Sequence, residues 1–176
     1  SYGTSAIGFG VNRFFGMSLK VGSFESFGIP VFWVGEVKAK HAFSVTYQRL
    51  IFRTEKIFSL DWGASVTAFQ SELTNENVFA FSIFPVLRFY LLRKKDFDFY
   101  TNYSIIGPTF LTKSNIDGLK TGPKITYQDT MGFGVFFGKE RKYNFELRIM
   151  HYSNGNIFTG NDGVAVPLQF TLGKTF

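Results

Sequence analysis

The chain has 176 residues, a formal net charge of +6, no cysteine, and 19% aromatic residues that include 24 phenylalanines. This length suits a single domain, and the lack of cysteine excludes a disulfide framework, a thiolate zinc site and a cysteine nucleophile. The aromatic content excludes a disordered chain and exceeds what the core of so small a domain needs.

Apolar and polar residues alternate along most of the chain with a period of two, which predicts β-strands with one apolar and one polar face. In chain order, the expected strands cover residues 4–11, 43–48, 58–68, 79–91, 97–105, 126–137, 144–149 and 166–176. Residues 12–40 contain further apolar stretches, which we expect to form a long loop or an extension of the first hairpin. No basic segment and apolar run follow Ser1, so we expect a mature chain whose export signal has been removed.

The predicted connections alternate between tight turns and long loops. The turns cover residues 53–56, 93–96 and 138–142, and the loops cover residues 71–77, 112–124 and 154–163. Short turns at one end and long loops at the other are typical of an up-and-down barrel of the bacterial outer membrane. The sequence therefore predicts an all-β fold, an eight-stranded antiparallel outer-membrane β-barrel that spans residues 1–176 as one domain.

A soluble barrel is the alternative fold, because its strands also alternate, but with the bulky apolar face directed inward. The polar face here carries charged residues among Ser, Thr and Gly, as expected of a narrow, salt-bridged interior: Asp61, Arg88, Asp98, Glu146 and Arg148. The chain also ends on Phe176 after an alternating strand, which resembles the ending of bacterial outer-membrane proteins. Both features favour the membrane barrel.

Two polar residues interrupt the apolar face of the penultimate strand. If residues 145–149 direct their apolar side chains toward lipid, alternation directs His151 and Ser153 toward lipid as well. Polar groups in hydrocarbon are costly and indicate function, and an imidazole beside a hydroxyl is the arrangement of an activated nucleophile. The alternative is that both residues lie in the headgroup zone, where polar side chains are ordinary.

A third polar residue is expected beside them. The turn at residues 138–142 centres near position 140, so antiparallel pairing sets Asp129 opposite His151. Asp129 is the one charged residue on the apolar face of its strand. A slip of one residue in the pairing would turn Asp129 inward.

The stretch His151-Tyr152-Ser153-Asn154, followed by Asn161-Asp162-Gly163 and a final strand, resembles the lipid A 3-O-deacylases, an acyloxyacyl hydrolase family. The resemblance implies a lipid-facing site that hydrolyses the ester of the acyl chain at the 3-position of lipid A. It further implies that His151 is the general base and Ser153 the nucleophile, while Asn154 and the backbone of Gly155 bind the oxyanion. Asp129 also matches an aspartate of the family.

The sequence departs from the family at one functional position. The family's third catalytic residue is a glutamate two residues after the Asn-Asp-Gly, and this chain has Ala165 there. Losing the residue that orients the base usually costs orders of magnitude in rate without abolishing catalysis. Either another acid substitutes, with Asp129 the first candidate and Asp162 the second, or the site has decayed.

The remaining expectations concern ligands and partners. Lys113, Lys120 and Lys124 lie in an outer loop, where they are expected to meet the phosphates of lipid A or lipopolysaccharide. The basic runs at 93–95 and 139–142 lie in short turns, so we expect no nucleic-acid partner, and we expect no metal or other cofactor. The alternative function is a catalytically inactive barrel of the same family that serves as a structural or interaction subunit among other outer-membrane proteins.

Overall fold

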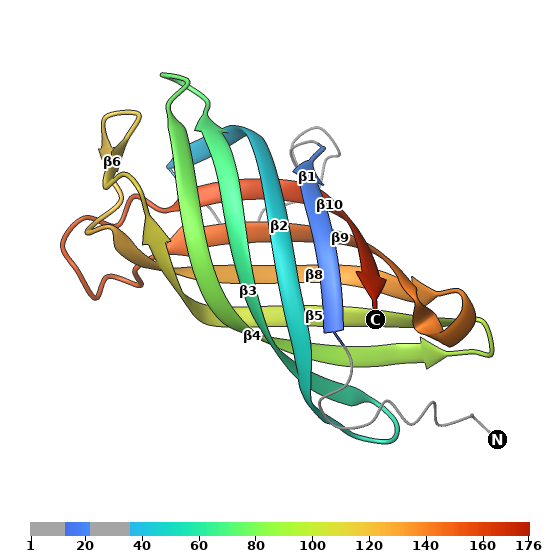
Figure 1. Cartoon of the computed structure of the whole chain (residues 1–176). Helices are drawn as coiled ribbons and strands as arrows, with labels where there is room; N and C mark the ends of the chain where they lie inside the picture. Colours follow the sequence, from blue (N-terminus) through green and yellow to red (C-terminus); the bar gives the residue numbers. More distant parts are fainter. Residues whose placement is uncertain (1–12, 22–35) are drawn as a thin grey trace.

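The computed structural model describes residues 13–21 and 36–176. These residues form the predicted eight-stranded antiparallel β-barrel (Figure 1). Its strands are β1 (Arg13–Lys20), β2 (Val37–Arg53), β3 (Phe58–Ser71), β4 (Asn77–Arg93), β5 (Phe97–Leu111), β8 (Ile125–Phe137), β9 (Tyr143–Ser153) and β10 (Val164–Thr175). A small hairpin of β6 (Asn115–Ile116) and β7 (Leu119–Lys120) rises from the β5–β8 loop, and the 3-10 turn η2 (Lys139–Arg141) joins β8 to β9. No helix in this described part is long and apolar enough to cross a membrane.

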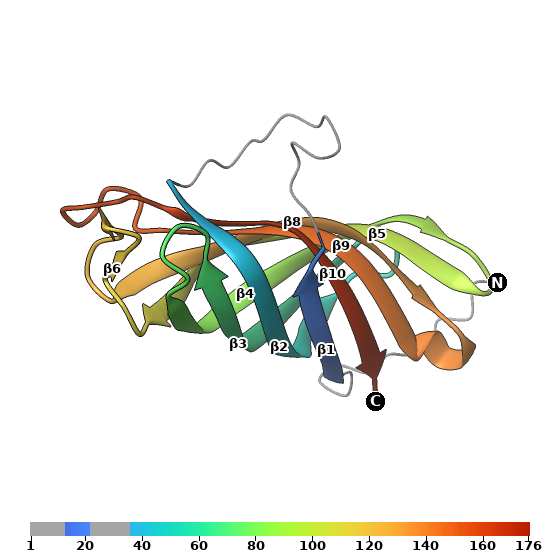
Figure 2. The same ribbon diagram turned by 90° about the horizontal axis from the view of Figure 1, so that it is seen from above.

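Strand β1 closes the barrel by pairing with β2 on one side and with β10 on the other (Figure 2). Within β1, Phe14 and Ser18 are buried, whereas Met17 and Leu19 are exposed. The strand predicted over residues 4–11 lies outside the described residues. The closing strand instead comes from the 12–40 stretch, which was expected to be a loop or a hairpin extension.

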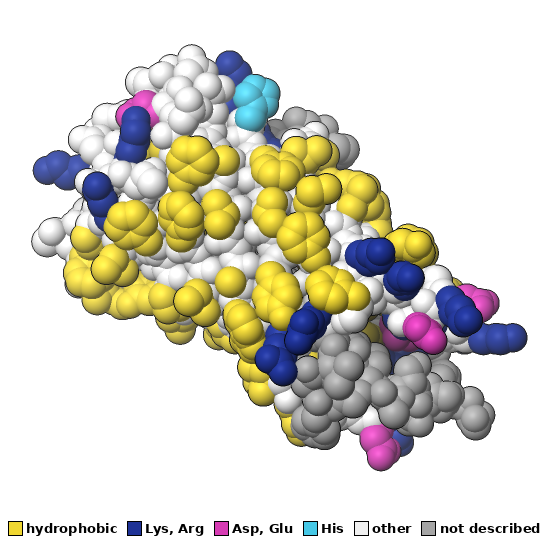
Figure 3. Space-filling view, viewed as in Figure 1, with side chains coloured by type: hydrophobic (Ala, Val, Ile, Leu, Met, Phe, Trp, Pro, Cys, Tyr) yellow, Lys and Arg dark blue, Asp and Glu magenta, His cyan; other side chains and the backbone are white. Residues whose placement is uncertain are grey.

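The apolar faces of the strands point outward, as the sequence predicted for a membrane barrel. Phe79, Phe81 and Ile83 of β4 are exposed, whereas Ala80 and Ser82 between them are buried. Figure 3 shows hydrophobic side chains across the middle of one face, with Lys and Arg near both ends. Lipid therefore takes the place of a protein core as the apolar phase for most of the phenylalanines.

The interior is filled by the expected polar network. Arg88 forms an ion pair with Asp61 at 3.0 Å and donates to Gln48 at 2.9 Å. Glu146 accepts hydrogen bonds from Tyr100 and Asn102, both at 2.7 Å. Charges that would be costly alone are thus paired or hydrogen-bonded inside the barrel, which agrees with a salt-bridged interior.

Two apolar clusters close the interior toward its ends. One, near the long loops, contains Val37, Ala39, Ala42, Phe69, Val78, Ala80, Leu111, Ile116, Met150, Tyr152, Val164 and Val166. The other, near the short turns, contains Phe14, Tyr90, Tyr100 and Phe136. The first cluster lies directly behind the end of β9, so it fixes the strand segment that carries the candidate site.

Candidate functional site

The end of β9 presents His151 and Ser153 on the outer surface of the barrel. Their neighbours Met150 and Tyr152 are 2% and 1% exposed and belong to the apolar cluster inside. The Tyr152 ring also stacks on Phe69, with ring centroids 6.2 Å apart. Because successive side chains of a strand alternate, anchoring the even positions inside holds His151 and Ser153 outside, where both are half-buried.

The register between β8 and β9 is the one predicted from the turn. Asp129 pairs with His151, and Tyr127 pairs with Ser153. Directly opposite residues of an antiparallel pair share a face, with Cβ atoms about 4.5–5.5 Å apart. The strand pairing therefore brings Asp129, His151 and Ser153 together on one lipid-facing patch.

The Asp129 carboxylate has a structural partner on the far side from His151. Its Oδ1 accepts the backbone N–H of Ile106 at 2.9 Å. Ile106 lies in an irregularity of β5 where the register with β8 shifts, and its φ is 54°. A backbone N–H left unpaired on the lipid-facing surface would be costly, so Asp129 stabilises this bulge with one of its two carboxylate oxygens.

On its other side, His151 faces β10. Ala165, the position of the family's glutamate, pairs directly with His151. A Cβ at Gly163 would lie 2.7 Å from Nε2 of His151, so the ring rests against the backbone of Gly163 and a methyl group there would displace it. His151 is therefore flanked by the carboxylate-bearing Asp129 on β8 and by the methyl group of Ala165 on β10.

Asn154 organises the loop that follows β9. Its side chain is fully buried, donating to the carbonyl of Gly160 at 2.7 Å and accepting the N–H of Asn156 at 2.9 Å. Its own backbone N–H donates to Asn161 at 2.8 Å. The next residue, Gly155, is exposed with φ of 60°, and its N–H makes no hydrogen bond within residues 13–21 and 36–176. Of the two expected oxyanion residues, Gly155 thus has its backbone donor available.

The other candidate acid, Asp162, is engaged with the β6–β7 hairpin. Its carboxylate accepts the backbone N–H of Lys120 at 2.9 Å, and its own N–H donates to the carbonyl of Lys120 at 3.0 Å. These two contacts dock the 154–163 loop onto the hairpin beside it (Figure 1, left). Asp162 therefore holds the 154–163 loop against the β5–β8 loop.

The lysines expected to meet phosphate differ in their surroundings. Lys120 and Lys124 are exposed, whereas Lys113 forms an ion pair with Glu76 at 3.0 Å. The backbone N–H of Asp117 donates to Glu76, and together with Lys113 and Thr74 it holds the pKa of Glu76 below its usual value. Within the described ranges, no three His, Asp or Glu side chains gather as metal ligands would.

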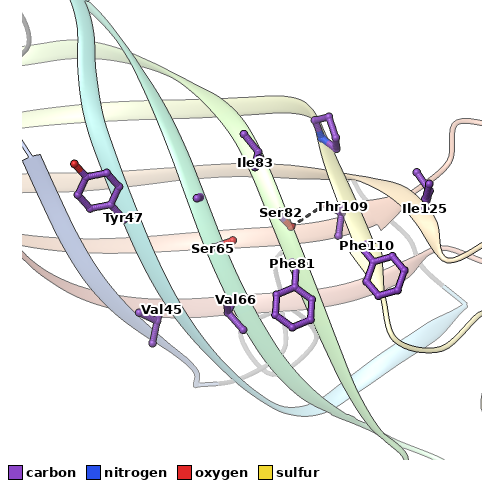
Figure 4. A pocket seen from close by; sticks show the side chains of 12 residues that line it. Val45, Tyr47, Ser65, Val66, Phe81, Ser82, Ile83, Thr109, Phe110 and Ile125 are labelled. Atoms are coloured by element: carbon purple, nitrogen blue, oxygen red, sulfur yellow. Dashed lines mark hydrogen bonds between the residues drawn. The ribbon is translucent and has the colours of Figure 1, made fainter.

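An apolar groove of about 630 Å³ lies on the outer surface near this patch (Figure 4). Its walls come from β2, β3, β4, β5 and β8: Val45, Tyr47, Ala64, Ser65, Val66, Phe81, Ser82, Ile83, Pro108, Thr109, Phe110 and Ile125. Pro108 pairs with Tyr127, which in turn pairs with Ser153. The near end of the groove therefore lies two strand spacings, about 10 Å, from the candidate nucleophile, with Tyr127 between them.

Three features of the site had weak signals in the sequence or none. Nothing in the spacing marked Gly163 as the support of the His151 ring or Tyr127 as the link to the groove. The β5 bulge had a signal, since Ile105 and Ile106 are two adjacent apolar residues that interrupt the alternation. Two outward side chains in a row indicate a bulge.

The chain is similar to known proteins in sequence and in structure. A family model described as lipid A 3-O-deacylase (PagL) matches residues 35–167. The structure is similar to that of the outer membrane enzyme PagL, with a TM-score of 0.64, 13% identity, and 93% of this chain and 98% of that chain covered. It is also similar to Neisserial surface protein A, with a TM-score of 0.52, 9% identity, and coverage of 94% and 96%. A search of curated protein sequences finds no match.

The structural similarities, at such low identity, establish the fold as an outer-membrane β-barrel. The family model covers three quarters of the chain, including β8, β9 and the first residues of β10, which carry the patch. This chain therefore belongs to the lipid A 3-O-deacylase (PagL) family and is a β-barrel of the bacterial outer membrane.

Proposed function

We propose that this protein is an outer-membrane esterase that removes the acyl chain at the 3-position of lipid A. Family membership supports a function of the lipid A deacylase type. The observation that carries the finer proposal is the pairing of Asp129 with His151, two residues before Ser153, on the lipid-facing surface. A membrane-embedded ester reaches such a site by lateral diffusion, without leaving the outer leaflet.

In the proposed mechanism, Ser153 Oγ attacks the ester carbonyl carbon while His151 accepts the hydroxyl proton. The tetrahedral intermediate then breaks its bond to the sugar oxygen, which takes the proton from His151. Water, activated by the same imidazole, hydrolyses the acyl-serine and releases the fatty acid. The backbone N–H of Gly155 is our preferred oxyanion donor, with Asn154 holding the loop that presents it.

Asp129 is the acid that we assign to orient His151. Its register position opposite His151 supports this role, and because the N–H of Ile106 occupies only Oδ1, Oδ2 is the atom that would accept from the imidazole. Asp162 is the weaker candidate, because its carboxylate is held by the backbone of Lys120. An acid supplied from β8 in place of β10 is the substitution that would keep the site active despite Ala165.

The surroundings of the patch suit an acylated, phosphorylated lipid. The apolar groove that begins at Pro108 and Ile125 offers a path for the acyl chain away from Ser153. The exposed Lys120 and Lys124 offer charge for the phosphates at the level of the long loops. The proposed substrate thus finds an apolar surface and a cationic surface on the two sides of the ester.

Mass spectrometry of lipid A tests this proposal. The lipid is extracted from cells that produce the wild-type protein or Ser153→Ala at equal levels, with folding checked by mobility on unheated gels. Wild-type cells are expected to accumulate lipid A that lacks one 3-linked acyl chain, and Ser153→Ala cells are expected to keep it. Identical acylation in both strains at good expression would refute the esterase proposal.

The second candidate is a catalytically inactive barrel that acts as a structural subunit among outer-membrane proteins. Ala165 favours it, because the residue paired with His151 on β10 carries no acid. Unchanged lipid A in the experiment above, together with a protein partner that cross-links to residues around Ser153, would support this alternative. Deacylation of lipid A by a patch that is open to lipid would exclude this alternative.

A further inference from the structure

Two β-bulges at the short-turn end of the barrel turn the side chains of two arginines toward the interior. In β2, Leu50 is buried, Ile51 and Phe52 are both exposed, and Arg53 is half-buried. The register between β2 and β3 shifts between Leu50 and Phe52. Strict alternation would direct Arg53 outward, so the extra residue turns its side chain back toward the interior.

Strand β4 repeats this arrangement. Tyr90 is buried, Leu91 and Leu92 are exposed, and Arg93 is half-buried, with the register shift between Tyr90 and Leu92. Bulges that recur at the same level of two strands are designed features of a barrel rim. The shared result is that both arginines approach the Tyr90 ring, with guanidinium carbons 5.1 Å (Arg53) and 4.0 Å (Arg93) from its centroid.

The carboxylates at this end are already paired with other arginines. Asp61 pairs with Arg88 at 3.0 Å, and Asp98 pairs with Arg141 at 3.2 Å. In the described part of the chain, no carboxylate lies within ion-pair distance of Arg53 or Arg93. Nε and Nη2 of Arg93 are buried without a hydrogen-bond partner, and only its Nη1 donates, to the carbonyl of Glu55.

A small cavity of about 40 Å³ opens beside Arg53 and the Tyr90 ring, and Arg93 lies outside its walls. Its walls include four arginines and two aspartates, which leaves an excess of two positive charges: Arg13, Arg53, Arg88, Arg141, Asp61 and Asp98. A cavity needs about one water's volume to hold a small polar group, so this one admits a compact group and excludes a chain. Arg88 and Arg141 pair with the two aspartates, so the excess positive charge of the cavity wall comes from Arg13 and Arg53.

We propose that the short-turn end of the barrel binds a phosphate group through Arg53, which lines the cavity, and Arg93, whose Nε and Nη2 lack a hydrogen-bond partner. The guanidinium fork matches the oxygens of phosphate in a bidentate geometry, and the half-buried position strengthens the attraction relative to open water. In an outer-membrane barrel the short turns face the periplasm. The phosphate therefore comes either from a phospholipid headgroup of the inner leaflet or from solution, and this site is separate from the patch around Ser153.

The test measures phosphate binding by the folded full-length barrel in a phosphate-free detergent micelle. One arm titrates inorganic phosphate against sodium chloride at matched ionic strength, and the other titrates a short-chain phosphatidylglycerol. Thermal unfolding followed by circular dichroism gives the apparent Kd. The variants are Arg53→Gln/Arg93→Gln and, as a control with the same loss of charge in an exposed turn, Lys94→Gln/Lys95→Gln.

We expect the wild-type protein and the lysine control to bind with the same affinity, and the arginine variant to bind about 10- to 100-fold more weakly. Arg93→Lys, which keeps the charge but loses the fork, should fall between them. Binding in the lipid arm alone identifies a headgroup, and binding in both arms identifies phosphate itself. The proposal is overturned if neither probe binds, or if the lysine control loses as much affinity as the arginine variant.

Discussion

Replacing Asp129 by Asn separates its contact with the β5 bulge, which is observed, from its proposed role in orienting His151. The Asn side chain keeps a carbonyl oxygen that can accept the N–H of Ile106, which Asp129 holds at 2.9 Å, but it removes the negative charge beside His151. Asp129→Ala removes both. The bulge in β5 should therefore persist in the Asn variant and be lost or strained in the Ala variant.

The expected magnitudes differ accordingly. Without the charge that orients and stabilises the imidazolium, the rate should fall by about 10²- to 10⁴-fold in both variants. An unpaired backbone N–H costs about 1–3 kcal/mol, so only Asp129→Ala should also lower the free energy of unfolding by that amount. Asp162→Asn, at the second candidate acid, should lower the proposed deacylation rate much less than Asp129→Asn.

The assay compares deacylation of lipid A in mixed micelles by the purified variants, and urea unfolding gives their stability. If Asp129→Asn retains the wild-type rate, Asp129 only supports the bulge and the assignment of a catalytic role is wrong. If Asp162→Asn shows the larger loss of rate, the acid that orients His151 is Asp162 in the 154–163 loop and not Asp129 on β8.

Three further predictions address the surroundings of the base and the outer loops. Ala165→Glu places a carboxylate on β10 opposite His151 and should raise the rate about tenfold or more; an unchanged rate in a folded variant would show that the β8 acid suffices. Gly163→Ala puts a methyl group 2.7 Å from the imidazole Nε2 and should slow deacylation about 10- to 100-fold with little change in the urea midpoint, whereas an unaffected rate would mean that the ring tolerates displacement. The pKa of Glu76 lies below its ordinary value of 4.5, so its contribution to loop stability is complete above that pH and is lost as the pH falls through the lower folded value. Hydrogen exchange of residues 72–76 and 112–124 should accelerate over that acidic range, and Glu76→Gln should remove this pH dependence.

The sequence was sufficient to predict the barrel fold and the register between β8 and β9 at the site. Alternation identified the outward and inward faces, and the turn centred on residue 140 predicted that Asp129 pairs with His151, as observed. Both inferences rest on the fixed period of a strand. The same period could not locate the first strand, because residues 4–11 and 13–20 alternate equally well, and only pairing with β2 and β10 distinguishes the strand that closes the barrel.

Close approaches between distant segments were beyond the reach of pattern analysis. Gly163 supports the His151 ring only because β10 runs beside β9. Asp162 was a candidate acid by spacing, yet its carboxylate holds the backbone of Lys120 in another loop. A side chain's partner depends on which loops pack together, and local sequence carries little information about that.

The bulges join the site and the phosphate proposal to one sequence feature. Three pairs of adjacent apolar residues break the alternation, at Ile51-Phe52, Leu91-Leu92 and Ile105-Ile106, and each coincides with a register shift. In each of these three pairs both side chains are exposed, which requires one extra residue in the ladder. The extra residue reverses the direction in which the side chains of the following residues in the strand point. In β2 and β4 it turns an arginine inward, and in β5 it exposes the N–H that Asp129 accepts. In this barrel, the three bulges therefore mark positions where polar side chains and backbone groups are redirected, and the register together with the sequence locates them.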